Sequence, residues 1–117
     1  EVVIAVEDDT SLASEAEEIL SEIGIDNVVV QVSKLKDGAP EHGPYDVIIL
    51  QGGIEEIPVS ILNQLKDGGR VGAIFVEKGL GTAKIGFKLN DKINWRYSFN
   101  AAAPVLPGFF KQKDFAL

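Results

Sequence analysis

Val2-Val3-Ile4-Ala5-Val6-Glu7-Asp8-Asp9 is a short apolar run, mostly β-branched, that leads directly into three acids. A continuous run of this kind is typical of a strand that is covered on both faces, as in a parallel sheet. In open α/β sheets, ligands bind beyond the carboxyl ends of the strands, where these acids stand. We therefore expect an α/β fold and regard the acids as candidate contacts for a ribose or a metal.

The next residues predict a helix and a second strand. Apolar positions recur at helical spacing, namely Leu12, Ala16, Ile19, Leu20 and Ile23. Asp9 or Thr10 is the expected N-cap, and Gly24 supplies the stop. A strand over residues 27–32 follows at once, which predicts a right-handed βαβ unit with a parallel pair. Residues 34–44 are rich in Gly and Pro, so we expect a loop there, or at most one helical turn.

The second half of the chain predicts two more strands, a hairpin and a strap. Tyr45–Leu50 is expected to be a buried strand that ends at Gln51-Gly52-Gly53. Pro58, as the N1 residue, should begin a short helix that runs through Leu65 and closes at residues 67–69, before a fourth strand over residues 70–76. The later segments are an antiparallel hairpin of residues 82–89 and 93–99 around a three-residue loop, and an irregular apolar strap over residues 101–117.

Composition limits the possible partners. The 117 residues are 45% hydrophobic and 25% charged, as in one ordinary globular domain. A net charge of -7 disfavours a nucleic-acid partner, because that affinity comes from Lys and Arg. No apolar run approaches the roughly 20 residues of a membrane span. The absence of cysteine fits a reducing, cytoplasmic location. Without methionine, Glu1 is not a translation start, so we expect this chain to be a piece of a longer protein.

Four stretches carry a resemblance when taken in order. They are Val3-Ile4-Ala5-Val6-Glu7, Pro44-Tyr45-Asp46-Val47-Ile48-Ile49-Leu50, Ile57-Pro58 through Leu62, and Gln64-Leu65-Lys66-Asp67-Gly68-Gly69-Arg70-Val71. Their sequence resembles the protein-L-isoaspartate O-methyltransferases, and the closing segment over residues 101–109 is similar to the short bacterial members. The resemblance implies the later part of a single Rossmann-like methyltransferase domain that depends on S-adenosylmethionine. Its substrate would be an isoaspartyl-containing protein or peptide.

The resemblance also implies a cofactor site. Glu7 matches the family acid that accepts hydrogen bonds from the ribose hydroxyls, and Asp8 lies beside it. Ser33-Lys34 occupies the place of the usual Gly-Asp pair near the adenine, where Lys34 cannot accept the adenine amino hydrogen. Gln51 follows the third strand, where the family borders cofactor and substrate. From the residues alone, the acids could equally be solvated partners of a helix dipole, and the glycines after Gln51 a tight turn.

The family's glycine-rich loop, its first strand and its catalytic elements would precede Val2. We therefore expect no catalytic residue in this chain and no methyl transfer by the chain alone. The first family strand would lie between the strands over residues 2–6 and 45–50. We expect these two strands to pair directly, giving the order 2-1-3-4 plus the hairpin. Strand exchange with a second copy, or contact through an exposed sheet edge, is the alternative.

Other interpretations stay open on the residues alone. Response-regulator receiver domains resemble the chain in length and in Glu7-Asp8-Asp9, but Gln51 stands at their phosphoacceptor position. A noncatalytic interaction module is a third possibility, with Trp95, Tyr97 and Phe99 alternating on one strand face. His42 is expected to be a surface residue. The paired acids Glu17-Glu18 and Glu55-Glu56 are expected to be solvated, because neither pair has a partner at metal-binding spacing.

Overall fold

The computed structural model describes residues 1–111, and these residues form two separate sheets. The first sheet pairs β1 (Val3–Glu7) with β2 (Val28–Val32). The second has the order β3-β4-β5-β6, formed by β3 (Tyr45–Ile54), β4 (Leu65–Glu77), β5 (Leu80–Leu89) and β6 (Lys92–Asn100). This arrangement is the expected α/β class, with parallel strands followed by an antiparallel hairpin. Our prediction for the hairpin loop needs correction, because Leu89 pairs with Lys92 and only Asn90 and Asp91, both at positive φ, form the turn.

The first sheet is a βαβ unit, which we call the amino-terminal unit (residues 1–33). Its helix α1 (Thr10–Glu22) has Asp9 as its N-cap, and the Asp9 carboxylate accepts a hydrogen bond from Leu12 N at 3.0 Å. α1 buries only Ala13 fully, whereas Leu12, Ile19 and Ile23 are more than half exposed. The predicted parallel pair is confirmed, with Glu7 opposite Val32 at its carboxyl end.

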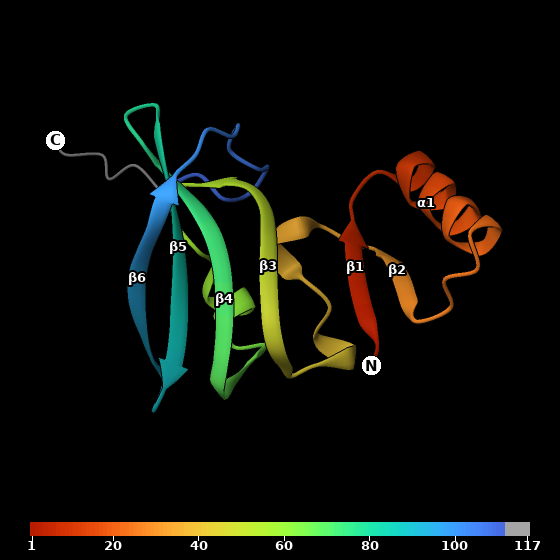
Figure 1. Ribbon diagram of the computed structural model, residues 1–117, viewed down its shortest axis with the longest axis horizontal. Coiled ribbons are helices and arrows are strands. Elements are labelled where there is room, and N and C mark those ends of the chain that lie inside the picture. The colour runs from red at the N-terminus through yellow and green to blue at the C-terminus, as the bar shows by residue number, and fades with distance from the viewer. Residues whose placement is uncertain (112–117) are drawn as a thin grey trace, which may run out of the picture.

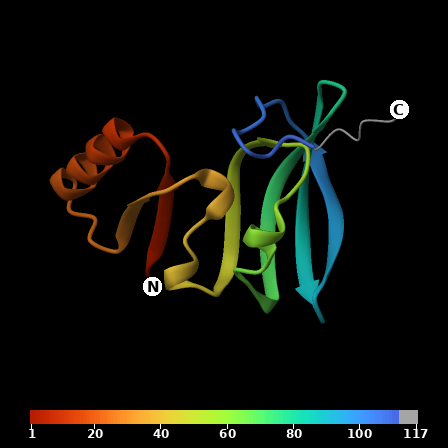
Figure 2. The same cartoon turned by 180° about the vertical axis from the view of Figure 1, so that it is seen from behind.

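Our prediction that β1 and β3 pair directly is wrong. Among the strands of the described residues, β1 pairs only with β2, and β3 pairs only with β4. Figures 1 and 2 show β1 and β3 side by side, with the chain passing from one sheet to the other through the loop after β2. That loop contains two short 3₁₀ helices, η1 (Leu35–Asp37) and η2 (Pro40–His42), in agreement with the predicted absence of a full helix. Leu35 packs on the core of the second sheet, and Asp37 and Ala39 are hydrogen-bonded to Gln64.

The core of the molecule lies on one face of the second sheet. Its fully buried members are Ile54, Ile61, Ala73 and Phe109, with Leu35, Ile48, Leu50 and Phe75 packed around them. Ile61 comes from α2 (Val59–Leu62), which is shorter than predicted and has Pro58 as its N-cap instead of N1. On the opposite face, the side chains of Val47, Ile49 and Ile85 are exposed. The second sheet is therefore covered on one face only by residues 1–111.

The strap over residues 101–111 packs against β3. Val105 bridges to Gly53, Leu106 N donates to Gly53 O at 2.8 Å, and Phe109 is 1% exposed. The expected strap is thus confirmed as far as Lys111, and the rest of the tail lies outside the described residues. β4 begins at Leu65, earlier than the predicted start at Arg70, because the chain returns into the sheet directly after α2.

Candidate functional site

Glu7 and Ser33 meet at the carboxyl ends of β1 and β2. Ser33 N donates to the Glu7 carbonyl oxygen at 3.1 Å, which extends the parallel ladder by one bond. Glu7 is half-buried, and its Oε1 accepts a hydrogen bond from Asp9 N at 3.2 Å. No described residue donates a hydrogen bond to the other carboxylate oxygen of Glu7. Because Glu7 also lies at a strand end, this oxygen is suited to accept hydrogen bonds from the hydroxyls of a ligand.

Ser33 has a second partner that anchors the following loop. Its Oγ donates to the Gly38 carbonyl oxygen at 2.8 Å, so the hydroxyl hydrogen is used within the protein. The hydroxyl oxygen still has lone pairs with which it can accept a hydrogen bond. Lys34, the next residue, is exposed and is the N-cap of η1. Of the two residues at the Gly-Asp position of the resemblance, Ser33 is therefore the one whose geometry permits an acceptor role.

The other two candidates differ in how close they lie to this pair. Asp8 is exposed and sits between Glu7 and the N-cap of α1. Gln51 is exposed on β3, in the other sheet, and no hydrogen bond joins it to Glu7, Asp8 or Ser33 within residues 1–111. Glu7, Asp8 and Ser33 thus lie at the ends of the strands of the first sheet, whereas Gln51 lies in the second sheet.

The glycines after Gln51 have a role that the sequence did not indicate. β3 continues through Gly52 and Gly53 to Ile54, so the predicted strand end and the predicted tight turn are both wrong. A Cβ on Gly53 would lie 2.8 Å from the carbonyl oxygens of Ala103 and Pro104, and one on Gly52 would lie 2.5 Å from Leu106. These two glycines are required by the close approach of the strap.

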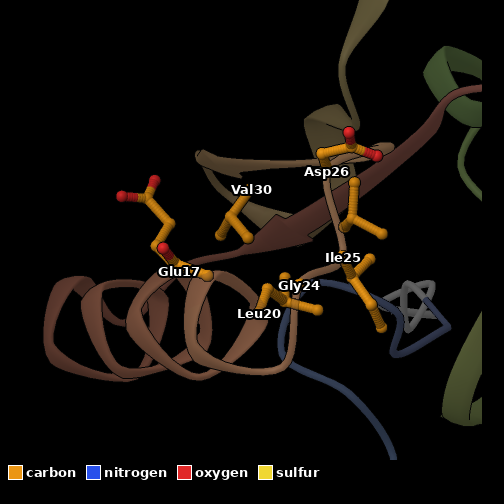
Figure 3. Close-up of a pocket in the computed structure, with 8 residues that line it drawn as sticks. Glu17, Leu20, Gly24, Ile25, Asp26 and Val30 are labelled. Carbon is orange, nitrogen blue, oxygen red and sulfur yellow. The ribbon is translucent and has the colours of Figure 1, made fainter.

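Two hollows in the described part of the chain have walls formed by residues other than the four candidates. One of about 420 Å³ lies between α1 and β2, with Glu17, Leu20, Asp26 and Val30 in its wall (Figure 3). The other, of about 530 Å³, is lined by Asp37, Pro40, Pro44, Ser60, Asn63 and Gln64. Glu7 and Ser33 line neither of these two hollows.

The remaining predictions concern surface exposure, metal binding and membrane spans. His42 is exposed, as expected. Glu55 is exposed too, but its Oε1 accepts a hydrogen bond from Lys111 N at 3.0 Å, so it anchors the strap in addition to facing solvent. Residues 1–111 hold no group of three His, Asp or Glu side chains placed to bind a metal. None of the helices in that range is long and apolar enough to cross a bilayer.

Comparison with known sequences gives a consistent result. Residues 1–98 match the family described as protein-L-isoaspartate(D-aspartate) O-methyltransferase. The protein-L-isoaspartate O-methyltransferase of Brucella anthropi is 38% identical over 69 residues, which cover 59% of this chain and 32% of that protein. Its namesake in Thermotoga maritima is 37% identical over 70 residues, covering 60% of this chain and 22% of that protein. The chain thus spans about a third or less of these relatives.

Solved structures show the same fold. A protein-L-isoaspartate O-methyltransferase aligns with a TM-score of 0.85 at 28% identity, over 92% of this chain and 34% of that one. A Plasmodium falciparum protein, described as a putative member of the same class in complex with S-adenosyl-L-homocysteine, aligns with a TM-score of 0.75 at 19% identity. That alignment covers 90% of this chain and 52% of the other. The two-sheet arrangement therefore corresponds to part of a larger methyltransferase fold.

Proposed function

We propose that this chain, which belongs to the protein-L-isoaspartate O-methyltransferase family, forms the ribose-binding side of the methyl-donor site in a larger enzyme. The reaction would be methyl transfer from S-adenosylmethionine to the carboxylate of an isoaspartyl residue in a damaged protein. The supporting observation is the pair Glu7 and Ser33, held at adjacent strand ends by the bond from Ser33 N to Glu7 O. The family match over residues 1–98 favours this function over a receiver domain.

In this proposal, the roles of the chain are to bind and to orient. Glu7 would accept hydrogen bonds from the ribose hydroxyls, with Asp8 beside it, and Ser33 would offer an acceptor toward the adenine. Gln51 would border the site from β3. The cofactor, when bound, supplies an electrophilic methyl group on its sulfonium. Because none of these residues aligns a carboxylate with that methyl, we propose that the chain alone transfers no methyl groups.

We further propose that the remaining part of the enzyme pairs with the free edges of β1 and β3. Within residues 1–111 no other strand pairs with these edges, although the strap bridges to Gly53 near the end of β3. Exposed apolar side chains lie on α1 and on β3, among them Ile19 and Ile49. Residues 1–117 would then be one portion of a single methyltransferase domain. Strand exchange with a second copy of this chain would use the same edges. Sedimentation at several protein concentrations distinguishes this dimer from a monomeric chain. The lack of cysteine agrees with a cytoplasmic location.

A chimera tests the proposed function. The segment of the Brucella anthropi protein that aligns with this chain is replaced by the corresponding residues of this chain, and methyl transfer to an isoaspartyl peptide is measured. We expect activity, and we expect Glu7→Gln to weaken S-adenosylhomocysteine binding about ten- to a hundredfold, because one charged hydrogen-bond acceptor is lost. Glu18→Gln, at an exposed position of α1, removes the same charge and should change nothing.

Circular dichroism separates a misfolded chimera from a folded one. The folded chimera and its Glu7→Gln and Glu18→Gln variants are then titrated with S-adenosylhomocysteine under the same conditions. Equal affinity of the chimera and its Glu7→Gln variant would contradict the assignment of Glu7. A folded chimera that neither binds the cofactor product nor transfers methyl groups would contradict the proposed function as a whole.

A further inference from the structure

Gln64, which directly follows α2 and Asn63, is a buried polar residue with no role in the site described above. Only 8% of the residue is exposed, and its side chain points into the loop that joins the sheets. Oε1 accepts a hydrogen bond from Ala39 N at 3.0 Å, and Nε2 donates to Asp37 O at 2.8 Å and to Ser60 O at 2.9 Å. Both amide hydrogens and the amide oxygen are therefore engaged, two of the three bonds being made to that loop.

Neighbouring side chains hold the same loop. Ser60 Oγ donates to Lys36 O at 2.7 Å, and Tyr45 Oη donates to Ala39 O at 2.5 Å. Burial raises the pKa of the Tyr45 phenol, with a smaller contribution from Glu41, so the hydroxyl keeps its hydrogen. We call these three side chains, Gln64, Ser60 and Tyr45, the loop clasp. The clasp joins the backbone of residues 36–39 to α2, to the residue before β4 and to β3.

The fit between Gln64 and Gly38 is close. Gly38 has a φ of +62°, and a Cβ placed on it would lie 2.6 Å from Gln64 Oε1. A larger residue would therefore meet the Gln64 amide directly and would also be strained in this backbone conformation. The loop and the amide are matched to each other in shape as well as in hydrogen bonding.

A continuous series of bonds leads from Gln64 to the candidate site. Gln64 holds residues 37 and 39, the Gly38 carbonyl between them accepts from Ser33 Oγ at 2.8 Å, and Ser33 N donates to Glu7 O at 3.1 Å. β1 and β3 are not paired, so no ladder fixes their relative position within residues 1–111. Leu35 also packs on the core of the second sheet, but an apolar contact is not directional.

We infer that Gln64 is a positioning residue, which orients the ends of β1 and β2, and with them Glu7 and Ser33, against the second sheet through the backbone of residues 37–39. Any effect of this orientation on cofactor binding rests on the proposed function. The orientation itself is independent of that function, because it is a property of the chain without any ligand.

Distance measurement between the two sheets tests the inference. The sequence has no cysteine, so Glu18→Cys on α1 and Lys92→Cys on β6, both exposed, accept a pair of spin labels at defined positions. Pulsed electron paramagnetic resonance then gives the distribution of distances between the units. We expect Gln64→Ala at least to double the width of that distribution, and the exposed neighbour Asn63→Ala to leave it unchanged.

A second substitution distinguishes the hydrogen bonds of the Gln64 side chain from its packing volume. Gln64→Met has a similar volume but neither donates nor accepts as the amide does, and we expect it to broaden the distribution as Gln64→Ala does. A Gln64→Met distribution as narrow as that of the parent would overturn the inference, since packing alone would then suffice.

A label pair within the second sheet, Glu77→Cys with Lys92→Cys, reports whether that sheet stays folded. Its distribution should stay narrow in every Gln64 variant. Broadening of this pair as well would overturn the inference, because Gln64 would then support the sheet itself. S-adenosylhomocysteine is absent from all these measurements, so their outcome and that of the chimera are independent.

Discussion

The amino-terminal unit and the second sheet differ in how well each is supported by its own contacts. The second sheet has a core of buried side chains that includes Ile54, Ile61, Val71 and Phe109, closed by the strap. The amino-terminal unit buries only Ala13 fully and exposes the apolar stripe of α1. Yet Glu7, Asp8 and Ser33 belong to the less buried unit. The candidate binding residues therefore depend on support from outside their own sheet.

This difference predicts where a core substitution has its largest effect. Phe109→Ala should lower the free energy of unfolding by about 3–5 kcal/mol, because it leaves a cavity under the strap. Phe110→Ala, at a side chain that is 61% exposed, is the matched control and should cost less than about 0.5 kcal/mol. Urea unfolding followed by the fluorescence of Trp95, the single tryptophan, measures both. Equal losses for the two variants would mean that the strap is not part of the core.

A smaller effect is expected in the amino-terminal unit. Asp9→Ala removes the N-cap of α1 and should destabilise the helix by about 0.5–2 kcal/mol. Amide hydrogen exchange of residues 11–22 should rise while exchange in β4 and β5 stays unchanged, since the two units are not hydrogen-bonded through their strands. Asp8→Ala, at an exposed acid beside it, serves as control. Faster exchange in β4 as well would show that the two units unfold together.

The smallest expected effect is the contribution of Tyr45, a member of the loop clasp, to the pH dependence of the free energy of unfolding. Because burial raises the pKa of Tyr45 above its ordinary value of 10.0, the unfolded chain loses this proton first as the pH rises. The free energy of unfolding should therefore be unaffected by this group below about pH 10 and fall above it. Urea titrations at several alkaline pH values should show a weaker decline for Tyr45→Phe than for the parent. Tyr97→Phe, at an exposed position, should retain the parent's decline.

Local sequence patterns predicted most helices and strands, because these elements depend mainly on residues that are close in the sequence. The apolar run before Glu7, the helical spacing from Leu12 to Ile23 and the Asp9 cap all correspond to observed structure. The predicted hairpin failed only in its loop, where two residues at positive φ replace the three expected. Favoured two-residue turns are usually signalled by Asn-Gly or Asp-Gly, and Asn90-Asp91 gives a weaker signal.

Long-range relations were not predictable in this way. Gly52-Gly53 resembles a turn, but its meaning comes from a strap that lies far later in the chain. Gln64 begins one of the stretches that carry the family resemblance, and only the structure shows that its amide reaches the loop at residues 37–39. Direct pairing of β1 and β3 was predicted because it would satisfy the edges of both strands, but the structure places the two strands in separate sheets.

The contact between the strap and Gly53 has a consequence for recombination among members of the family. Gly53 N donates to Pro104 O at 2.8 Å, and the Gly53 carbonyl accepts from Leu106 N at the same distance. Residues 52–53 and 103–106 thus constrain one another, although they are far apart in the sequence. A crossover anywhere between them joins a strand from one parent to a strap from another. Such hybrids should survive only when both parents have glycine at position 53.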